Sequence, residues 1–173
     1  MALELIAAVA AAFVLGGIAL ILRKFSGNRL PKWVVSAAAG VGLIGFTIWS
    51  EYDWFTRVSA ELPDGVEVVW HPTEAMPLRP WTYLAPITTR FVAMDVRSVA
   101  AHPNNPDLRM AKLFNFARWT PVRDGLVVVD CGAKRHVLVT EGVEITPEGT
   151  LKGAEWTQGF VSEEFETAAC TAS

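Results

Sequence analysis

The chain of 173 residues is 51% hydrophobic and carries a formal net charge of −3. The charge is divided unevenly. Residues 1–50 hold four basic and one acidic side chain, a balance of +3, whereas residues 51–173 hold eleven basic and seventeen acidic side chains, a balance of −6. The acidic majority argues against nucleic-acid binding, which favours a clustered basic face. Residues 51–173 are enough for one domain with its own core.

Two apolar runs without a charged side chain, residues 5–22 and 33–50, dominate the N-terminal region. A helix of about 18 to 20 residues matches a hydrocarbon core of roughly 30 Å. Soluble helices of this length usually have a polar face, and neither run has one. The sequence therefore predicts a transmembrane helical hairpin over residues 1–55, with helices at about 5–22 and 33–50. The alternative is a pair of core helices in a soluble domain.

The first run differs from a cleaved signal peptide. Such a peptide has basic residues before its apolar stretch and small residues at a cleavage site after it. Here the early charge is Glu4, and the basic residues Arg23 and Lys24 follow the run. This order favours an uncleaved helix that enters the membrane with its N-terminus outside.

A short basic loop separates the two runs and predicts their orientation. It contains Arg23, Lys24, Arg29 and Lys32 and no acidic residue. Basic loops stay on the cytoplasmic side, so we expect both termini to lie on the outer side of the membrane. Four aromatic residues are expected as anchors at the membrane–water interfaces. These are Trp33 at the inner interface and Trp49, Tyr52 and Trp54 at the outer one.

Small residues recur every four positions in both runs. This spacing lets helix backbones approach closely in lipid. Two interpretations are open: the helices pack on each other as a hairpin, or a surplus small-residue face docks on another membrane protein. The predicted packing positions are Ala8, Ala12 and Gly16 in the first helix and Ser36, Ala38, Gly40 and Gly42 in the second.

After the hairpin, the sequence predicts a proline-rich connector over residues 56–89 and a mainly antiparallel β domain over residues 90–173. Prolines at positions 72, 77, 80 and 86 interrupt regular structure in the connector. Residues 102–107 are a turn cluster, and Asp124-Gly125 is a hairpin signal. The expected strands are Val66–Trp70, 90–99, 108–120, 126–130 and 134–140.

The strand at 90–99 alternates between two candidate faces. Val92, Met94, Val96 and Ser98 form the better core face, and the side with Phe91 and Ala93 is expected to face outward. Near the C-terminus, residues 162–169 are expected to form a short helix. Ser162 is a suitable N-cap, and the acidic residues that follow it favour a helix N-terminus. The predicted class is thus an α+β membrane protein, a helical hairpin followed by an outer antiparallel sheet closed by one helix.

Both cysteines, Cys131 and Cys170, lie in the expected outer domain. In an oxidising compartment, an even pair is most simply a disulfide. Two free buried thiols are an alternative. A metal site with His136 is another, although Cys131 and His136 match no recurring ligand spacing.

Residues 129–138, Val-Asp-Cys-Gly-Ala-Lys-Arg-His-Val-Leu, resemble a signature of the bacterial surface-adhesin protein E-like domain, in which a strand ends in an acidic residue, a cysteine and a short basic stretch. Residues 166–170 are similar to the family's closing element, residues 91–99 to its first strand, and Trp156 precedes the closing helix at a similar distance. The resemblance covers residues 90–170 and implies a small extracytoplasmic sheet domain with a Cys131–Cys170 disulfide and no catalytic residues. In one branch of the family, adhesion to host proteins is associated with a lipid anchor on the outer surface, whereas this chain has two apolar helices. This departure points to a bacterial inner-membrane protein with both termini and the sheet domain in the periplasm.

The sequence contains no recognisable catalytic, phosphate-binding or haem-attachment motif, and no charge lies within either apolar run. We therefore expect no enzymatic activity and no cofactor. The predicted function is an accessory or structural subunit of a larger respiratory, photosynthetic or secretory inner-membrane complex, in contact with the lipid bilayer. The alternatives are a membrane-tethered periplasmic binding module and a transient assembly factor.

Overall fold

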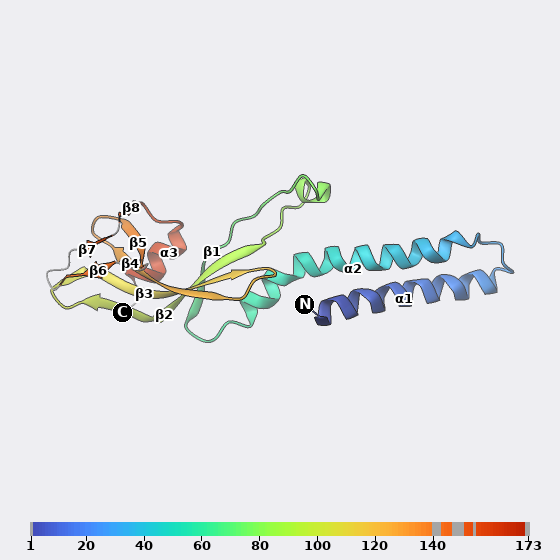
Figure 1. Cartoon of the computed structure of the whole chain (residues 1–173), viewed down its shortest axis with the longest axis horizontal. Coiled ribbons are helices and arrows are strands. Elements are labelled where there is room, and N and C mark those ends of the chain that lie inside the picture. Colours follow the sequence, from blue (N-terminus) through green and yellow to red (C-terminus); the bar gives the residue numbers. More distant parts are fainter. Residues whose placement is uncertain (1, 140–142, 147–150, 154, 172–173) are drawn as a thin grey trace. The chain divides into compact units, whose positions relative to one another are not determined.

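A computed structural model describes residues 2–139, 143–146, 151–153 and 155–171 of the chain. The chain divides into two compact units, Met1–Arg57 and Val58–Ser173. We call the first the helical pair and the second the sheet domain, and we describe each by itself. Figure 1 labels their elements.

The helical pair consists of α1 (Ala2–Phe25) and α2 (Trp33–Ala60), joined by a turn in which Gly27 and Asn28 have positive φ angles. Both helices are long and apolar enough to cross a membrane, as judged by length and composition. Helix α2 continues ten residues beyond the end of the apolar run. Residues 51–60 contain neither glycine nor proline, so nothing in the local sequence ends the helix there.

The sheet domain contains an open six-stranded sheet in the order β1-β2-β3-β4-β5-β8, in which all neighbouring strands are antiparallel. A separate two-stranded pair, β6–β7, and one helix, α3, complete the domain. The bounds are β1 Val66–Trp70, β2 Arg90–His102, β3 Asn105–Ala117, β4 Arg123–Asp130, β5 Arg135–Val139, β6 Glu144–Ile145, β7 Leu151–Lys152, β8 Thr157–Gln158 and α3 Glu163–Cys170.

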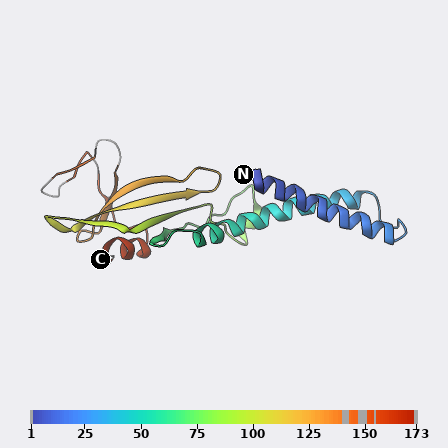
Figure 2. The same ribbon diagram turned by 90° about the horizontal axis from the view of Figure 1, so that it is seen from below.

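The expected antiparallel sheet and short C-terminal helix are confirmed. Helix α3 lies against one face of the sheet, as Figure 2 shows, and contacts β1, β2 and β3. Its Phe165 packs with Met94, Val127 and Val129 in the main core of the domain. A second, smaller core lies on the opposite face, where Leu108 and Val128 are buried.

The predicted core face of β2 is only partly correct. Met94 is buried in the main core as expected, but Phe91 and Ala93, which the alternation assigned to the outer face, are also 0% exposed. Phe91 stacks on Phe116 of β3, with 4.6 Å between the ring centroids. Simple alternation failed here because this end of β2 is covered on both faces.

A wide bulge interrupts β2 beyond Asp95. Four residues of β2, at positions 96–99, lie opposite the single residue Ala111 of β3. The Ser98 hydroxyl restores the hydrogen bonding: it accepts from the backbone N–H of Lys112 at 2.8 Å and donates to the Asp95 carbonyl at 2.6 Å. The bulge ends the regular alternation that the sequence suggested.

The prediction that Asp124-Gly125 forms a hairpin turn is wrong. Both residues lie within β4, where Asp124 pairs with Phe114 and Gly125 with Leu113. The turn falls earlier, at residues 118–122, and contains Trp119 at a φ of 74°. An Asp-Gly pair has the local preference for a turn, but the long β3–β4 ladder keeps it extended.

Residues 71–89, within the predicted proline-rich connector, form an arm between β1 and β2. Glu74 and Ile87 exchange backbone hydrogen bonds, and a 3₁₀ turn, η1 (Pro80–Tyr83), forms the tip. The fully buried Thr82 locks this tip: its hydroxyl accepts from the Met76 N–H at 2.8 Å and donates to the Arg79 carbonyl at 2.7 Å.

Candidate functional site

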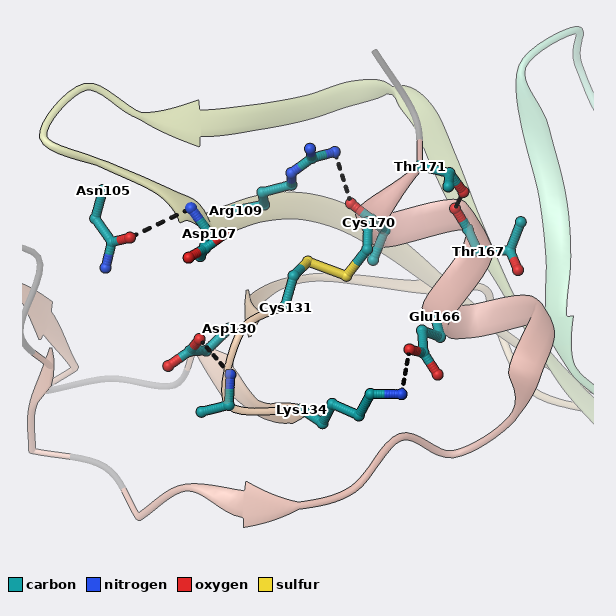
Figure 3. Close-up of a disulfide and its surroundings, with 12 residues drawn as sticks. Asn105, Asp107, Arg109, Asp130, Cys131, Lys134, Glu166, Thr167, Cys170 and Thr171 are labelled. Atoms are coloured by element: carbon teal, nitrogen blue, oxygen red, sulfur yellow. Dashed lines mark hydrogen bonds and ion pairs between the residues drawn. A yellow bond between two sulfur atoms is a disulfide. The ribbon is translucent and has the colours of Figure 1, made fainter.

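The two predicted cysteines form a disulfide that joins the end of β4 to the end of α3 (Figure 3). The Cα atoms of Cys131 and Cys170 are 5.9 Å apart, and 39 positions separate them in the sequence. The disulfide prediction is confirmed, and the alternatives of free thiols and a cysteine metal site are wrong. His136 instead places its Nδ1 atom 2.8 Å from the Gly159 carbonyl oxygen.

Three further contacts hold α3 on the sheet. At its N-terminus the predicted cap is confirmed, since the Ser162 hydroxyl accepts from the Phe165 N–H at 3.0 Å and also donates to the Val69 carbonyl of β1. At its C-terminus, Nη1 of Arg109 donates to the Ala169 carbonyl at 3.3 Å, a favourable place for a cation. A 2.8 Å ion pair between Lys134 and Glu166 anchors the middle (Figure 3).

Beside the disulfide, a nearly buried carboxylate organises the β4–β5 turn. The Arg135 guanidinium donates from Nε and Nη2 to Oδ2 of Asp130, at 2.9 and 2.8 Å, and the Ala133 N–H donates to Oδ1 at 3.0 Å. Burial alone would raise the pKa of Asp130, but the Ala133 and Arg135 hydrogen bonds outweigh it and lower this pKa. Arg135 also lies over the Trp156 ring, 4.5 Å from its centroid. Asp130 and Arg135, which flank Cys131 and the turn after it, thus have a structural role.

In the helical pair, four of the predicted small residues lie where the helices meet. A Cβ atom built on Gly42 would come within 2.7 Å of the Ala11 carbonyl oxygen and 3.2 Å of the Ala12 Cα, so only glycine fits. A Cβ atom built on Gly16 would lie 3.4 Å from the Ala39 Cβ, which is an ordinary contact. Ala8 is buried.

The remaining small residues are placed differently. Ser36 and Gly40 are exposed, and a Cβ atom on Gly40 would meet nothing within 4 Å. Ala38 is half-buried. The pair therefore uses one small-residue face for its own contact and leaves a second one open.

The four predicted membrane anchors all lie in α2. Trp33 and Trp49 are exposed, whereas Tyr52 and Trp54 are half-buried. At the end of the pair away from the turn, Arg57 lies 3.7 Å from Glu4 of α1 and 3.5 Å from Asp53. This ion-paired end contrasts with the basic turn, since residues 5–50 contain no acidic side chain.

The basic turn contains a recess of about 340 Å³. Two of the four residues predicted to set the topology, Arg23 and Lys24, line it, whereas Arg29 and Lys32 do not. The Arg23 Nε donates to the Leu30 carbonyl at 3.0 Å, which holds this side chain against the turn. The other lining residues are Leu20, Ile21 and Asn28.

A smaller recess of about 180 Å³ lies at the β2–β3 turn, lined mainly by apolar residues that include Met110 and Pro103. Ligand sites for small molecules usually exceed about 300 Å³, so its size does not support one. Within the described part of the chain, no group of three or more His, Cys, Asp or Glu side chains is arranged to hold a metal ion.

Sequence reasoning located the disulfide and the basic turn but missed Asp130, Arg109 and Thr82. The sequence Asp-Cys-x-x-x-Arg at residues 130–135 could have indicated the role of Asp130, because an acidic and a basic residue flank the break between two predicted strands. Arg109 and Thr82 had no such signal, since their partners are a helix end far away in the sequence and the backbone of a loop.

No protein-family model, curated protein or solved structure matches this chain. The resemblance of residues 90–170 to the surface-adhesin protein E-like domain therefore stays a prediction.

Proposed function

We propose that this chain is a non-catalytic accessory subunit of a larger bacterial inner-membrane complex. In this proposal, α1 and α2 cross the membrane and the sheet domain lies in the periplasm. The observation that supports the proposal most directly is that the helical pair exposes large apolar side chains and packs through small ones. Large side chains such as Leu3 and Phe13 are about four-fifths exposed, while small residues make the contact between helices. Side chains so distributed suit a lipid solvent.

The orientation rests on charge and redox chemistry. The basic turn would lie in the cytoplasm, where positively charged loops are retained. Both cysteines of the disulfide would then lie in the oxidising periplasm, where such bonds persist. A reporter that is active only in the periplasm, fused after Ser173, should be active. A fusion that works only in the cytoplasm would contradict the orientation.

The open small-residue face of α2 supports membership in a complex. Because Gly40 is not needed for the contact with α1, its exposed backbone is available for close approach by another helix. A tagged chain at its natural expression level, extracted in mild detergent, should co-elute with defined integral membrane proteins at constant stoichiometry. A transient assembly factor would instead be missing from the mature complex.

A matched pair of variants sharpens this experiment. Gly40→Val should lose the co-eluting proteins, whereas Gly45→Val, also with open space around its Cα, should keep them because it lies on another side of α2. The proposal would be contradicted if both variants retained the co-eluting proteins equally. Repeated recovery of the wild-type chain alone would also contradict it.

A tethered periplasmic binding module is the second candidate. It is favoured by the apolar side chains exposed on the sheet face opposite α3, where Met110 and Leu126 are more than a third exposed. In that case Leu126→Ser should abolish capture of an envelope component by the sheet domain. The same variant should leave the co-elution with integral membrane proteins unchanged.

A further inference from the structure

We propose that the recess at the α1–α2 turn binds the phosphate group of an anionic phospholipid. The inference rests on the proposed membrane anchoring, and it adds a ligand that this anchoring does not require. Two positively charged side chains, one amide and two apolar side chains line the recess. These groups match the parts of a phospholipid in chemistry and in order.

The order follows from helix geometry. Residues 20, 23 and 24 are related by spacings of three and four, so they are neighbours on one face of α1. Leu20 and Ile21 therefore lie about one turn, roughly 5 Å, from Arg23 and Lys24 along the axis. An acyl chain over the exposed Leu20 and Ile21 would bring its phosphate to the two cations.

The cations are available for an anion. Residues 5–50 contain no aspartate or glutamate, so this part of the sequence offers no carboxylate to neutralise Arg23 or Lys24. The bond from Arg23 to the Leu30 carbonyl uses only Nε, which orients the guanidinium and leaves its two terminal nitrogens for a forked contact with phosphate. The negative end of the α1 dipole opposes an anion with about half a charge, but two full positive charges outweigh it.

Size and polarity favour a lipid over free phosphate. The recess of about 340 Å³ is open to its surroundings and is larger than one phosphate requires. Its apolar half would stay empty around an inorganic ion. In the proposed orientation, the recess also faces the cytoplasmic leaflet, which is rich in anionic headgroups.

The test uses the full chain purified in a mild detergent, with phosphatidylglycerol and phosphatidylcholine added at equal concentration. Native mass spectrometry should show several-fold more retained phosphatidylglycerol, because the choline cation of the other lipid is repelled by Arg23 and Lys24. The double variant Arg23→Gln/Lys24→Gln should lose this preference. The control Arg29→Gln/Lys32→Gln removes the same charge from the same turn outside the recess and should keep it.

The other outcomes each contradict the site. Equal retention of both lipids by the wild type, or equal loss in both double variants, would mean diffuse charge attraction rather than a site. If inorganic phosphate at the same concentration abolished retention of phosphatidylglycerol, the recess would be a site for free phosphate. Flotation of wild-type proteoliposomes separates the two proposals: a chain that floats without a lipid preference retains its anchoring and loses only this inference.

Discussion

The helical pair and the sheet domain bury opposite kinds of side chain. In the helical pair, alanine and glycine make the contact, and large apolar side chains such as Leu3 and Phe13 are exposed. In the sheet domain, the large side chains of Phe91, Met94 and Phe165 are at most 2% exposed. In the proposed membrane anchoring, each region matches its surface to its solvent, lipid for the helical pair and water for the sheet domain.

The difference also changes what holds each region together. In water, burial of a large apolar side chain contributes about 1.5–3 kcal/mol, so the sheet domain gains stability from its core. In lipid that driving force is absent, and helix association depends on close packing of backbones. Breaking each region should therefore require a different kind of substitution, and damage to one should leave the other intact.

The largest expected effect is Phe165→Ala in the sheet domain. Phe165 is 2% exposed and joins α3 to the main core, so its truncation should lower the free energy of unfolding by about 3–5 kcal/mol. Hydrogen exchange with mass spectrometry on the full chain should show lost protection in residues 58–173 only. The control Tyr83→Ala, at an exposed aromatic residue, should change stability by less than about 0.5 kcal/mol. Lost protection in α1 would contradict the independence of the two regions.

Removal of the disulfide should come next. Closure of a loop of about forty residues contributes roughly 3–4 kcal/mol in the chain-entropy description, so Cys131→Ser/Cys170→Ser should destabilise the sheet domain by that amount. Reductant should lower the unfolding midpoint of the wild type to that of the double variant. It should leave the midpoint of the double variant unchanged. A wild-type midpoint that does not respond to reductant would argue against the disulfide.

The helical pair should be most sensitive at Gly42. A valine there collides with the Ala11 carbonyl, and overpacking of this kind costs about 1–3 kcal/mol. Gly40→Val is the matched control, because the same side chain meets open space at that position. Unfolding in detergent, followed by circular dichroism during titration with sodium dodecyl sulfate, should separate the two variants. Equal midpoints would show that the predicted close approach does not stabilise the pair.

The smallest expected effect is a pH dependence confined to the sheet domain. Because the pKa of Asp130 is lowered in the folded state, its contribution is present above the ordinary aspartate pKa of about 3.9 and is lost as the pH falls through the folded value. The free energy of unfolding of the wild type, measured with denaturant, should therefore fall below about pH 4. In Asp130→Asn this fall should be smaller. Asp124→Asn should change it less, since water screens the exposed pair of Asp124 with Lys112. A steeper loss in Asp130→Asn would contradict the role of Arg135.

Local sequence predicted the features that depend on neighbouring residues. The uncharged runs identified both helices, and Ser162 with the glutamates after it identified the start of α3. The strand at Val66–Trp70 was predicted with its observed bounds. The expected strand at 134–140 corresponds to β5, although Thr140 lies outside the described residues. These elements need only a periodic pattern, a cap or a turn residue.

Local sequence failed where distant segments compete for the same residues. The Asp124-Gly125 pair favours a turn, but cross-strand pairing with Leu113 and Phe114 holds it in β4. Phe91 lies on the expected outer face, yet stacking on Phe116 buries it. In each case several long-range contacts outweighed one local preference.

By itself, the sequence determined the division into an apolar helical part and an acidic sheet part, because composition and charge act without regard to fold. It also determined where the basic turn lies and that two cysteines are available to pair. Only the tertiary structure decided which small residue lies at the helix contact. Gly42 meets Ala11 while Gly40 faces outward. The spacing is the same for both, and the rotation of one helix against the other, a property of the packed pair, distinguishes them.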